Sequence, residues 1–554
     1  MQNNREDDNL IMEKEAGISG AASATLLKGA TILAIAGIVS KLFGAIFRIP
    51  LTNMIGAEGQ SYYSAAYPVY QLLYTIATAG FPVAISRMVS ERIAKGDYIN
   101  AHKSYKLAMK VSAILGFTAF IIMFAGAGAI ARAYKNPGAE ASMRAISFAL
   151  LLTPFLASMR GYYQGRQEMK PTGVTEVIEQ MARVAVGLSL AYAFYRTSLE
   201  KAAAGATFGA SAGVIAALIV MIFIYRSDRG RRKKLVKESV LVKETDKQRL
   251  KELLIFVVPI TIGSSIMPIM FNIDAAIVMR RLIATGWGYT EAKKLYGLMG
   301  GYADPIVGMP FVFVDALCIS LMPAVTTAFT LKNKKELDGH IKTGLKTMMI
   351  ITYPCTTGLI VLGGPILSML YYKKPDEAAM AVPILQILAL TIVVLAIMRA
   401  FSTSLQGIGK MMLPVWNLFI GAVVKTIVSY VLVGIPSLNV NGAAIGSLAA
   451  YVTAGTLNYI ALKKHADISL DVKSIFVTPL FPTLIMGAGA ILSYKLLFLA
   501  TSSNAVSTLL AIMIAVIIYF VSVFLTGAVT KEEIEMIPKG DLIYRIAERL
   551  KIAR

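Results

Sequence analysis

A stripe of two cations and two glycines runs through the first long apolar segment of the chain. Gly37, Lys41, Gly44 and Arg48 follow the spacing i, i+4, i+7 and i+11, which places them on one face of a helix. A charged side chain in hydrocarbon costs roughly 3 kcal/mol or more, so this face is expected to point into the protein. The stripe is then an anion-binding wall, unless Arg48 extends to the membrane surface instead.

Three charged residues of a later apolar segment share one helical face. Glu179 and Arg183 have the i, i+4 spacing of an intrahelical ion pair, and Glu176 lies close to both along the same face. These residues either line a polar cavity or form a pair that only neutralises itself. Arg87 ends the second apolar segment, where a binding role and an anchor at the membrane surface both remain open.

Charged residues also interrupt the apolar segments of the second half. Asp304 and Asp315 would share a face of an unbroken helix, but Pro305 and Pro310 between them predict a kink. Breaks of this kind occur where backbone lines a cavity. If the charged residues meet, their Arg and Lys side chains can hold the phosphates of a large anionic headgroup. The candidate binding residues are Lys41, Arg48, Arg87, Glu179, Arg183, Asp304, Asp315, Arg399 and Lys425.

Motifs of common energy-coupling and catalytic sites are missing from the sequence. It contains neither a Walker-type glycine loop nor an HExxH zinc motif. Cys318 and Cys355 lie in apolar segments and the three histidines lie in polar connections, so neither a disulfide framework nor a metal cluster is expected. We therefore expect a transporter and not an enzyme, with no bound cofactor.

Composition and apolar runs predict an all-α polytopic membrane protein. Of 554 residues, 56% are hydrophobic and only 16% are charged, and the mean hydropathy is +0.63. Apolar runs of about 20 residues, each long enough to cross the bilayer, recur from Leu27 to Phe524. We count fourteen transmembrane helices, which form two six-helix lobes and a C-terminal pair. They run near 27–50, 62–86, 107–131, 143–163, 174–195, 203–225, 253–279, 300–329, 343–371, 380–403, 414–434, 441–462, 475–499 and 506–527.

The basic residues set the predicted topology. The net charge of +22 needs no nucleic acid, because basic connections follow from the positive-inside rule and attract anionic phospholipids. Segment 226–251 alone holds 11 Lys and Arg, so this segment and both termini should face the cytoplasm. The polar start lacks a signal-peptide pattern and should remain as a mobile tail. The predicted parts are a tail at 1–24, lobes at 25–225 and 252–464 around the basic loop 226–251, a final helix pair at 465–530 and a cytoplasmic tail at 531–554.

An internal repeat relates the two six-helix lobes. A Gln-Gly pair precedes a proline in each lobe, and a cation stands 19 residues beyond each glutamine. Chance similarity between apolar segments is the alternative, but two pseudo-symmetric lobes explain the pattern better. The paired residues are Gln164-Gly165 with Gln406-Gly407, Arg183 with Lys425, and Pro82 with Pro323, and the same alignment brings Pro171 within one position of Pro414.

Three stretches of the chain resemble a known family. LLKGATILAIAGIVSKLFGAIFRIPL with GAEGQSYY, GFPVAISRMVSERIAKGD and RGYYQGRQEMKPTGVTEVIEQMAR are similar to the stage V sporulation protein B and MurJ-like branch of the multidrug/oligosaccharidyl-lipid/polysaccharide exporter superfamily. The resemblance implies a flippase of a bacterial plasma membrane, with two lobes around a central cavity. Its cargo would be an undecaprenyl-linked sugar precursor, most specifically lipid II, moved to the outer leaflet for cell-wall, spore-cortex or polysaccharide synthesis. Cell-wall synthesis proteins are the implied partners.

The resemblance also implies roles for single residues. Ser40-Lys41 matches a Ser-Arg pair of the family, with Lys in place of Arg, whereas the next family arginine falls on Phe47, beside Arg48. A basic residue of the family's second span falls near Tyr74-Thr75, and its Ala-Asp-Arg motif reads Ala303-Asp304-Pro305 here. The chain therefore resembles a divergent, sporulation-type or Gram-positive relative more than MurJ itself.

Ion coupling and two other functions stay open at this point. Some relatives hold sodium with acids of the seventh and eleventh spans, where Asp274 and Asn417 stand in this chain. Na+ or H+ coupling, or the membrane potential, would then drive the cycle. A cation-coupled multidrug antiporter of the same superfamily and a non-transporting scaffold of cell-wall assembly are the alternatives.

Overall fold

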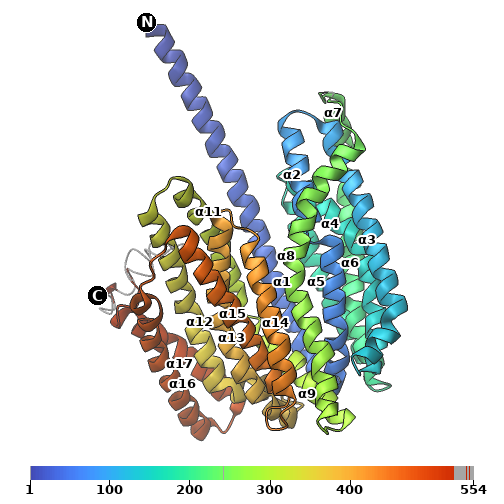
Figure 1. Ribbon diagram of the computed structural model, residues 1–554, viewed down its shortest axis with the longest axis vertical. Coiled ribbons are helices and arrows are strands. Elements are labelled where there is room, and N and C mark those ends of the chain that lie inside the picture. Colours follow the sequence, from blue (N-terminus) through green and yellow to red (C-terminus); the bar gives the residue numbers. More distant parts are fainter. Residues whose placement is uncertain (1, 241, 530–544, 546–547, 550–554) are drawn as a thin grey trace. The chain divides into compact units, whose positions relative to one another are not determined.

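The computed structural model describes residues 2–240, 242–529, 545, 548 and 549, and every regular element among them is helical. Figure 1 shows these helices as long, nearly antiparallel rods within each part of the chain. The first half contains α1 (Gln2–Thr78), α2 (Phe81–Ala94), α3 (Tyr98–Ala133), η1 (Pro137–Ala139), α4 (Glu140–Gly165), α5 (Lys170–Phe194), α6 (Leu199–Ser227) and α7 (Arg229–Lys237). The second contains α8 (Asp246–Ala284), α9 (Tyr289–Leu298), η2 (Met299–Ala303), α10 (Asp304–Val307), α11 (Phe311–Thr330), α12 (Lys334–Leu370), α13 (Pro375–Gly407), α14 (Leu413–Val433), α15 (Asn441–Ala466), η3 (Lys473–Val477), α16 (Leu480–Thr501) and α17 (Asn504–Leu525).

Thirteen stretches of the described residues are long and apolar enough to cross a membrane. The first of them, Val39–Ala94, is 56 residues long, which is enough for two crossings of about 20 residues each. It is interrupted at Gly56, whose φ of 63° and ψ of −172° lie outside the helical region and favour glycine. Counting this stretch as two crossings gives the fourteen that the apolar runs predict. The expected tail at 1–24 differs, since α1 begins at Gln2, and most of the expected tail at 531–554 lies outside the described residues.

The predicted kink between Asp304 and Asp315 is confirmed. The π-helical η2 leads into the short α10, and α11 begins only at Phe311, after Pro310. Glycines let this broken segment and the end of α9 lie directly on α1. A Cβ at Gly301 of η2 would stand 2.5 Å from Gln60 Cγ, and one at Gly297 of α9 would stand 1.7 Å from the carbonyl oxygen of Ala57. The break therefore belongs to a close helix contact and positions Asp304 at its end.

The internal repeat predicted from sequence has structural counterparts. Gly165 ends α4 and Gly407 ends α13, and Pro171 and Pro414 each lie in the first turn of the following helix. A Cβ at Gly165 would meet Val89 of α2, and one at Gly407 would meet Val325 of α11. The two equivalent glycines therefore pack on equivalent helices, α2 and α11, which supports a repeat over chance similarity.

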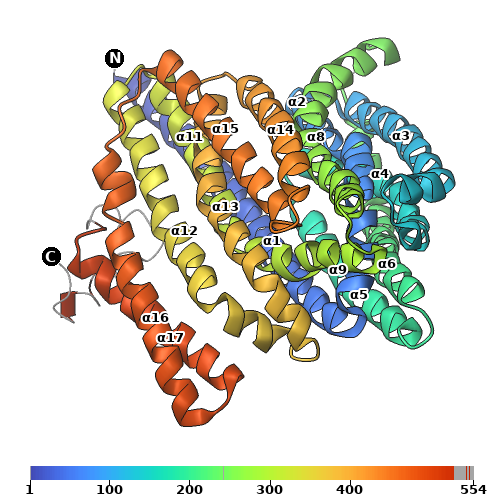
Figure 2. The ribbon, with the colours of Figure 1, turned by 60° about the horizontal axis from the view of Figure 1, so that its bottom comes forward.

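The chain forms two compact units whose limits differ from the predicted lobes. Unit 1 contains residues 1–47, 66–131 and 138–268, and unit 2 contains 48–65, 132–137 and 269–554. The first part of α8, predicted to start the second lobe, belongs to unit 1, because Gly80 lets the α1–α2 turn approach Val257 of α8 closely. The final pair, α16 and α17, packs on α12 within unit 2, as Figure 2 shows.

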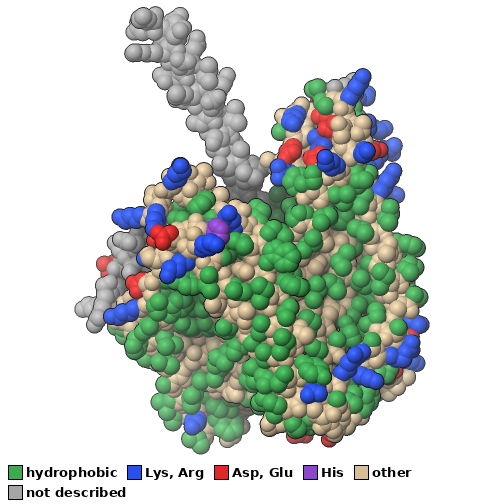
Figure 3. Space-filling model, in the orientation of Figure 1, with side chains coloured by type: hydrophobic (Ala, Val, Ile, Leu, Met, Phe, Trp, Pro, Cys, Tyr) green, Lys and Arg blue, Asp and Glu red, His purple; other side chains and the backbone are tan. Residues whose placement is uncertain are grey.

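Apolar side chains cover the sides of the helices. In Figure 3 the visible face of each unit is mostly hydrophobic, and charged side chains gather towards the ends of the helices. Large residues such as Ile219 and Phe223 on α6 are 63% and 72% exposed, which in water would be costly. This distribution is that of a protein whose surface contacts lipid.

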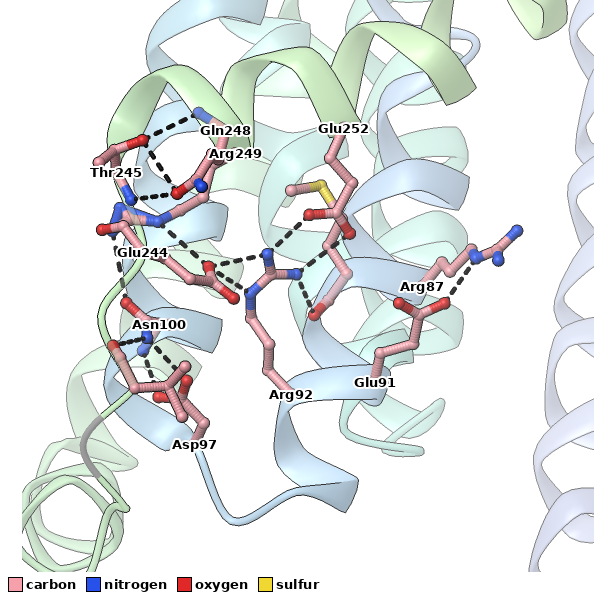
Figure 4. A network of polar contacts seen from close by, with 12 residues as sticks. Arg87, Glu91, Arg92, Asp97, Asn100, Glu244, Thr245, Gln248, Arg249 and Glu252 are labelled. Carbon is pink, nitrogen blue, oxygen red and sulfur yellow. Dashed lines mark hydrogen bonds and ion pairs between the residues drawn. The ribbon is translucent and has the colours of Figure 1, made fainter.

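Buried ion pairs hold one end of unit 1 together. Arg92 of α2 donates to Glu244 and Glu252 at distances down to 2.9 and 2.7 Å, and Figure 4 shows its guanidinium between the two carboxylates. In a second contact, Arg166 after α4 binds Asp228 after α6. Burial lowers the pKa of Arg166, but the hydrogen bond to Asp228 together with the charges of Tyr162, Glu168 and Asp228 outweighs this effect, so the net pKa is raised. These pairs attach the start of α8 to α2 and the end of α6 to the turn that precedes α5.

Candidate functional site

Arg48 of α1 is held by neutral groups inside a membrane-spanning stretch. Its Nη1 donates to the carbonyl oxygen of Gly300 at 2.8 Å, and its guanidinium lies 4.8 Å from the centre of the Tyr63 ring. The carbonyl is available because η2 is π-helical at this point. No ion pair with a carboxylate neutralises Arg48 among the described residues. Lys41, two turns earlier on the same stripe, is exposed.

The charged face of α5 binds partners on other helices of unit 1. Glu179 accepts a hydrogen bond from Arg160 of α4 at 2.9 Å, so its partner is not the expected Arg183. Arg183 donates to the hydroxyl of Tyr67 at 2.8 Å and lies over the ring of Phe47. Tertiary contact thus replaces the intrahelical pair that spacing predicts.

Close packing of α6 fixes α5 in this position. A Cβ at Gly209 would lie 2.6 Å from the carbonyl oxygen of Arg183, and one at Gly213 would lie 2.5 Å from that of Glu179. Residues 209–213 read GASAG and match the GxSxG pattern of serine hydrolases, which requires a strand, a sharp turn and a helix. Here the pattern lies within α6, and Ser211 donates to the carbonyl oxygen of Ala145. Its role is helix packing.

A buried ion pair and a further acid lie together in unit 2. Lys425 Nζ donates to Asp274 Oδ2 at 2.7 Å, and the two side chains are 1% and 10% exposed. The other oxygen, Asp274 Oδ1, is buried without a hydrogen-bond partner among the described residues. Asp304, at the start of α10, is exposed, and the charges of Arg48, Asp274 and Lys425 all act on its carboxylate. Unit 2 therefore gathers four of the predicted residues in one neighbourhood.

Three of the remaining predicted residues lie outside this group. Arg399 and Asp315 form an ion pair at 3.7 Å, with each side chain 43% exposed. Arg87 pairs with Glu91 at 2.7 Å on the outside of α2 and lies over the ring of Phe256. Of the two readings of Arg87, this position favours the surface anchor.

Asp274 and Asn417, the two residues proposed to bind sodium, form hydrogen bonds with different side chains. Asn417 donates to Asn458, and Asn458 donates to Ser402, each at 2.8 Å. Asp274 is engaged by Lys425, whose ammonium supplies a positive charge at the carboxylate. Sodium binding by Asp274 and Asn417 therefore stays a prediction.

Two charged contacts were not anticipated from the sequence. Arg160 stands in the stretch RGYYQG, but its partner Glu179 is on the next helix. Lys293 of α9 lies in a polar connection and donates to Glu58 and to the Tyr62 hydroxyl at 2.5 and 2.9 Å. Burial lowers the pKa of Lys293, but these hydrogen bonds outweigh it and leave the pKa raised. The sequence shows that Arg160 and Lys293 are charged, but it does not show which residues they contact.

An all-helical array of membrane-crossing helices, with charged side chains held inside it, defines a polytopic membrane transporter. Comparison with solved structures shows the same fold. A multidrug resistance transporter of the MATE family, in an inward-facing conformation, matches with a TM-score of 0.67 and 15% identity over 77% of this chain and 94% of that one. The lipid II flippase MurJ in an inward closed conformation matches with a TM-score of 0.63 and 16% identity over 89% and 98%.

Two family models each match more than half of the chain. The model described as lipid II flippase MurJ matches residues 182–537, and the model described as polysaccharide biosynthesis protein matches residues 26–312. The protein therefore belongs to the MurJ-like family of membrane transporters. It is a transporter and not an enzyme, and it is a multi-pass protein of the bacterial plasma membrane.

Three relatives from Bacillus subtilis match most of this chain. An uncharacterized membrane protein, YabM, is 28% identical over 94% of this chain and 96% of its own length. Lipid II flippase MurJ is 27% identical over 81% and 85%, and stage V sporulation protein B is 25% identical over 95% and 100%. These matches support the predicted relationship to the sporulation and MurJ-like branch.

Proposed function

We propose that this transporter is a flippase for a diphosphate-linked lipid sugar, with peptidoglycan lipid II as the specific cargo. The cargo is carried from the inner to the outer leaflet by alternating access. Membership of the MurJ family supports the class of cargo. One relative is a lipid II flippase and another is a sporulation protein. The cargo would therefore serve the synthesis of the cell wall or of the spore cortex.

The position of Arg48 carries the proposal. An arginine in a membrane-spanning helix is expensive and is retained mainly for function. Its contacts, a carbonyl oxygen and an aromatic ring, orient the guanidinium without neutralising its charge. A phosphate oxygen would supply the missing negative charge and could form a two-pronged hydrogen bond with the planar guanidinium.

Ion coupling belongs to the same proposal. Asp274, which is buried, and Asp304, which is exposed, are carboxylates of unit 2, and the charge of Asp274 acts on Asp304. Binding of H+ or Na+ at this pair would change the local charge and thus the balance between conformations. The membrane potential is a further driving force, because moving one elementary charge across 100 mV contributes about 2.3 kcal/mol.

Transport by purified protein in liposomes tests the proposal. Fluorescent lipid II is incorporated into the vesicles, and its appearance in the opposite leaflet is followed by chemical quenching. The wild-type protein should flip it, Arg48→Glu should lose at least tenfold in rate, and Arg48→Lys should retain part of it. Thermal unfolding of each variant checks that the protein is folded.

A dye-efflux experiment on the same vesicles tests the alternative, a multidrug antiporter. Efflux of a cationic dye, measured on the same vesicles, should be absent if the cargo is anionic. Dye efflux that persists or rises in Arg48→Glu, together with no lipid II flipping by the wild type, would overturn the proposal. Absence of both activities would favour the scaffold.

A further inference from the structure

A basic pocket opens beside the ion-pair network of unit 1. It has a volume of about 430 Å³ and lies between the first turns of α3 and the start of α8. Its lining includes Lys103, Lys106 and Lys110 of α3, together with Glu244, Asp246 and Arg249. None of the residues that carry the proposed transport function lines this pocket, so an inference from it goes beyond that function.

The three lysines form a free cationic edge. Their spacing of i, i+3 and i+7 places them along one face of α3, and all three are exposed. Within the described part of the chain, none of them forms an ion pair or hydrogen bond. Three unneutralised ammonium groups on one edge repel each other, so an anion bound among them is favoured.

The acids of the pocket are engaged by internal arginines. Glu244 accepts from Arg92 at 2.9 Å, and Asp246 accepts from Arg249 at 2.6 Å. Figure 4 shows Glu244 turned towards Arg92. These carboxylates are therefore partly neutralised already and do not cancel the lysines.

Arg249 contributes a buried donor to the same pocket. Its side chain is only 2% exposed, and its Nη2 is bound to the carbonyl oxygen of Glu244. Its Nε is buried without a hydrogen-bond partner among the described residues and lies 3.6 Å from Glu244 Oε2, too far for a good bond. A buried donor without an acceptor is costly, and an anion in the pocket could satisfy it directly or through water.

The depth of the pocket matches the headgroup region of a membrane. The stretch Tyr98–Ala133 has 36 residues and rises about 54 Å, more than the hydrocarbon thickness of about 30 Å. Large exposed apolar side chains on α3 begin at Ile114, which is 66% exposed, one turn beyond Lys110. The lysines therefore lie beside the boundary of the apolar surface, where lipid phosphates are found.

We propose that this pocket binds the phosphate group of an anionic ligand through Lys103, Lys106, Lys110 and Arg249. A glycerophospholipid headgroup and a soluble phosphate share this chemistry. Bound there, the anion would link α3 to the segment that leads into α8 and would stabilise the attachment of that segment to unit 1.

Lipid binding to the purified full-length protein tests the proposal. A phosphatidylglycerol with a fluorescent tail is titrated in neutral detergent, and its anisotropy is recorded. The triple variant Lys103→Gln/Lys106→Gln/Lys110→Gln should bind at least tenfold more weakly than the wild type. The control Lys233→Gln/Lys234→Gln/Lys237→Gln removes the same charge from exposed positions of α7 and should change binding less than threefold.

Competition identifies the source of the phosphate. If millimolar inorganic phosphate fails to displace the probe, the ligand is a lipid. If micromolar inorganic phosphate displaces the probe, the ligand is a soluble phosphate. Both results agree with a phosphate-binding pocket. Equal weakening in the two triple variants would reduce the effect to general charge attraction and overturn the pocket. Unchanged binding in the α3 variant would also overturn it. Thermal unfolding of both variants confirms folding before titration.

Discussion

Lys425 and Asp274 form an ion pair across 151 residues of sequence, with 2.7 Å between Nζ and Oδ2 and almost no exposure of the ammonium. The pair joins α14 to α8 inside unit 2. Two opposite charges in a low-dielectric interior attract strongly, but each has lost its hydration. Their joint presence is therefore far less costly than the presence of either one alone.

Removal of one partner should destabilise the protein more than removal of both. We expect Lys425→Met to cost roughly 3–5 kcal/mol, because it leaves a buried carboxylate without its counter-charge. The double variant Asp274→Asn/Lys425→Met should recover most of this loss. Unfolding in detergent measures the stability of Lys425→Met, of Asp274→Asn and of the double variant against the wild type. A double variant whose loss of stability equals the sum of the two single losses would contradict a coupled pair.

The contact between α9 and α1 depends on the absence of a side chain at Gly297. We expect Gly297→Ala to lower the unfolding temperature by several degrees, because the new Cβ would overlap the Ala57 carbonyl oxygen. The control is Gly339→Ala in α12, where a Cβ would meet nothing within 4 Å. There the better helix propensity of alanine should stabilise the protein by up to about 1 kcal/mol. Equal effects at both positions would contradict the close contact.

The number of membrane crossings, the helix break near Asp304 and the internal repeat could be predicted from the sequence. Apolar length gave fourteen crossings, and the prolines around Asp304 marked a real break between α10 and α11. The repeat could be recognised because Gln164-Gly165 and Gln406-Gly407 end equivalent helices. Each of these depends on residues that are close together along the chain, or on the comparison of two such groups.

Partners on different helices could not be predicted in this way. Spacing favoured Arg183 for Glu179, but Arg160, 19 residues earlier, is closer in space because α4 and α5 turn back on each other. Sequence marked Asp274 and Lys425 as charges needing partners without showing that they are each other's partner. Packing of helices decides such choices, and it depends on many weak contacts spread over the chain.

The predicted topology can be tested by labelling introduced cysteines. The basic connection after α6 should face the cytoplasm, so a cysteine at the exposed Lys237 should react with a membrane-impermeant maleimide only after cells are opened. A cysteine at the exposed Arg196, between α5 and α6, should react in intact cells. Both are placed in a background with Cys318→Ala and Cys355→Ala, since these two cysteines are free. Labelling in the reverse pattern would invert the orientation.

The lysine of the first cationic stripe should be needed for transport. Lys41 lies two turns before Arg48 on α1, is exposed, and occupies the position where the resemblance to MurJ places an arginine. A phosphate-bearing cargo needs a positive charge here but not a particular cation, since both side chains can donate to phosphate oxygens. We expect Lys41→Ala to reduce lipid II flipping in liposomes at least tenfold, whereas Lys41→Arg should keep at least half of the rate. Lys28→Ala, which removes a charge from the same helix 13 residues earlier, is the matched control and should transport normally. Loss of folded protein in Lys41→Ala would assign the lysine a structural role, and normal flipping by that variant would exclude it from cargo binding.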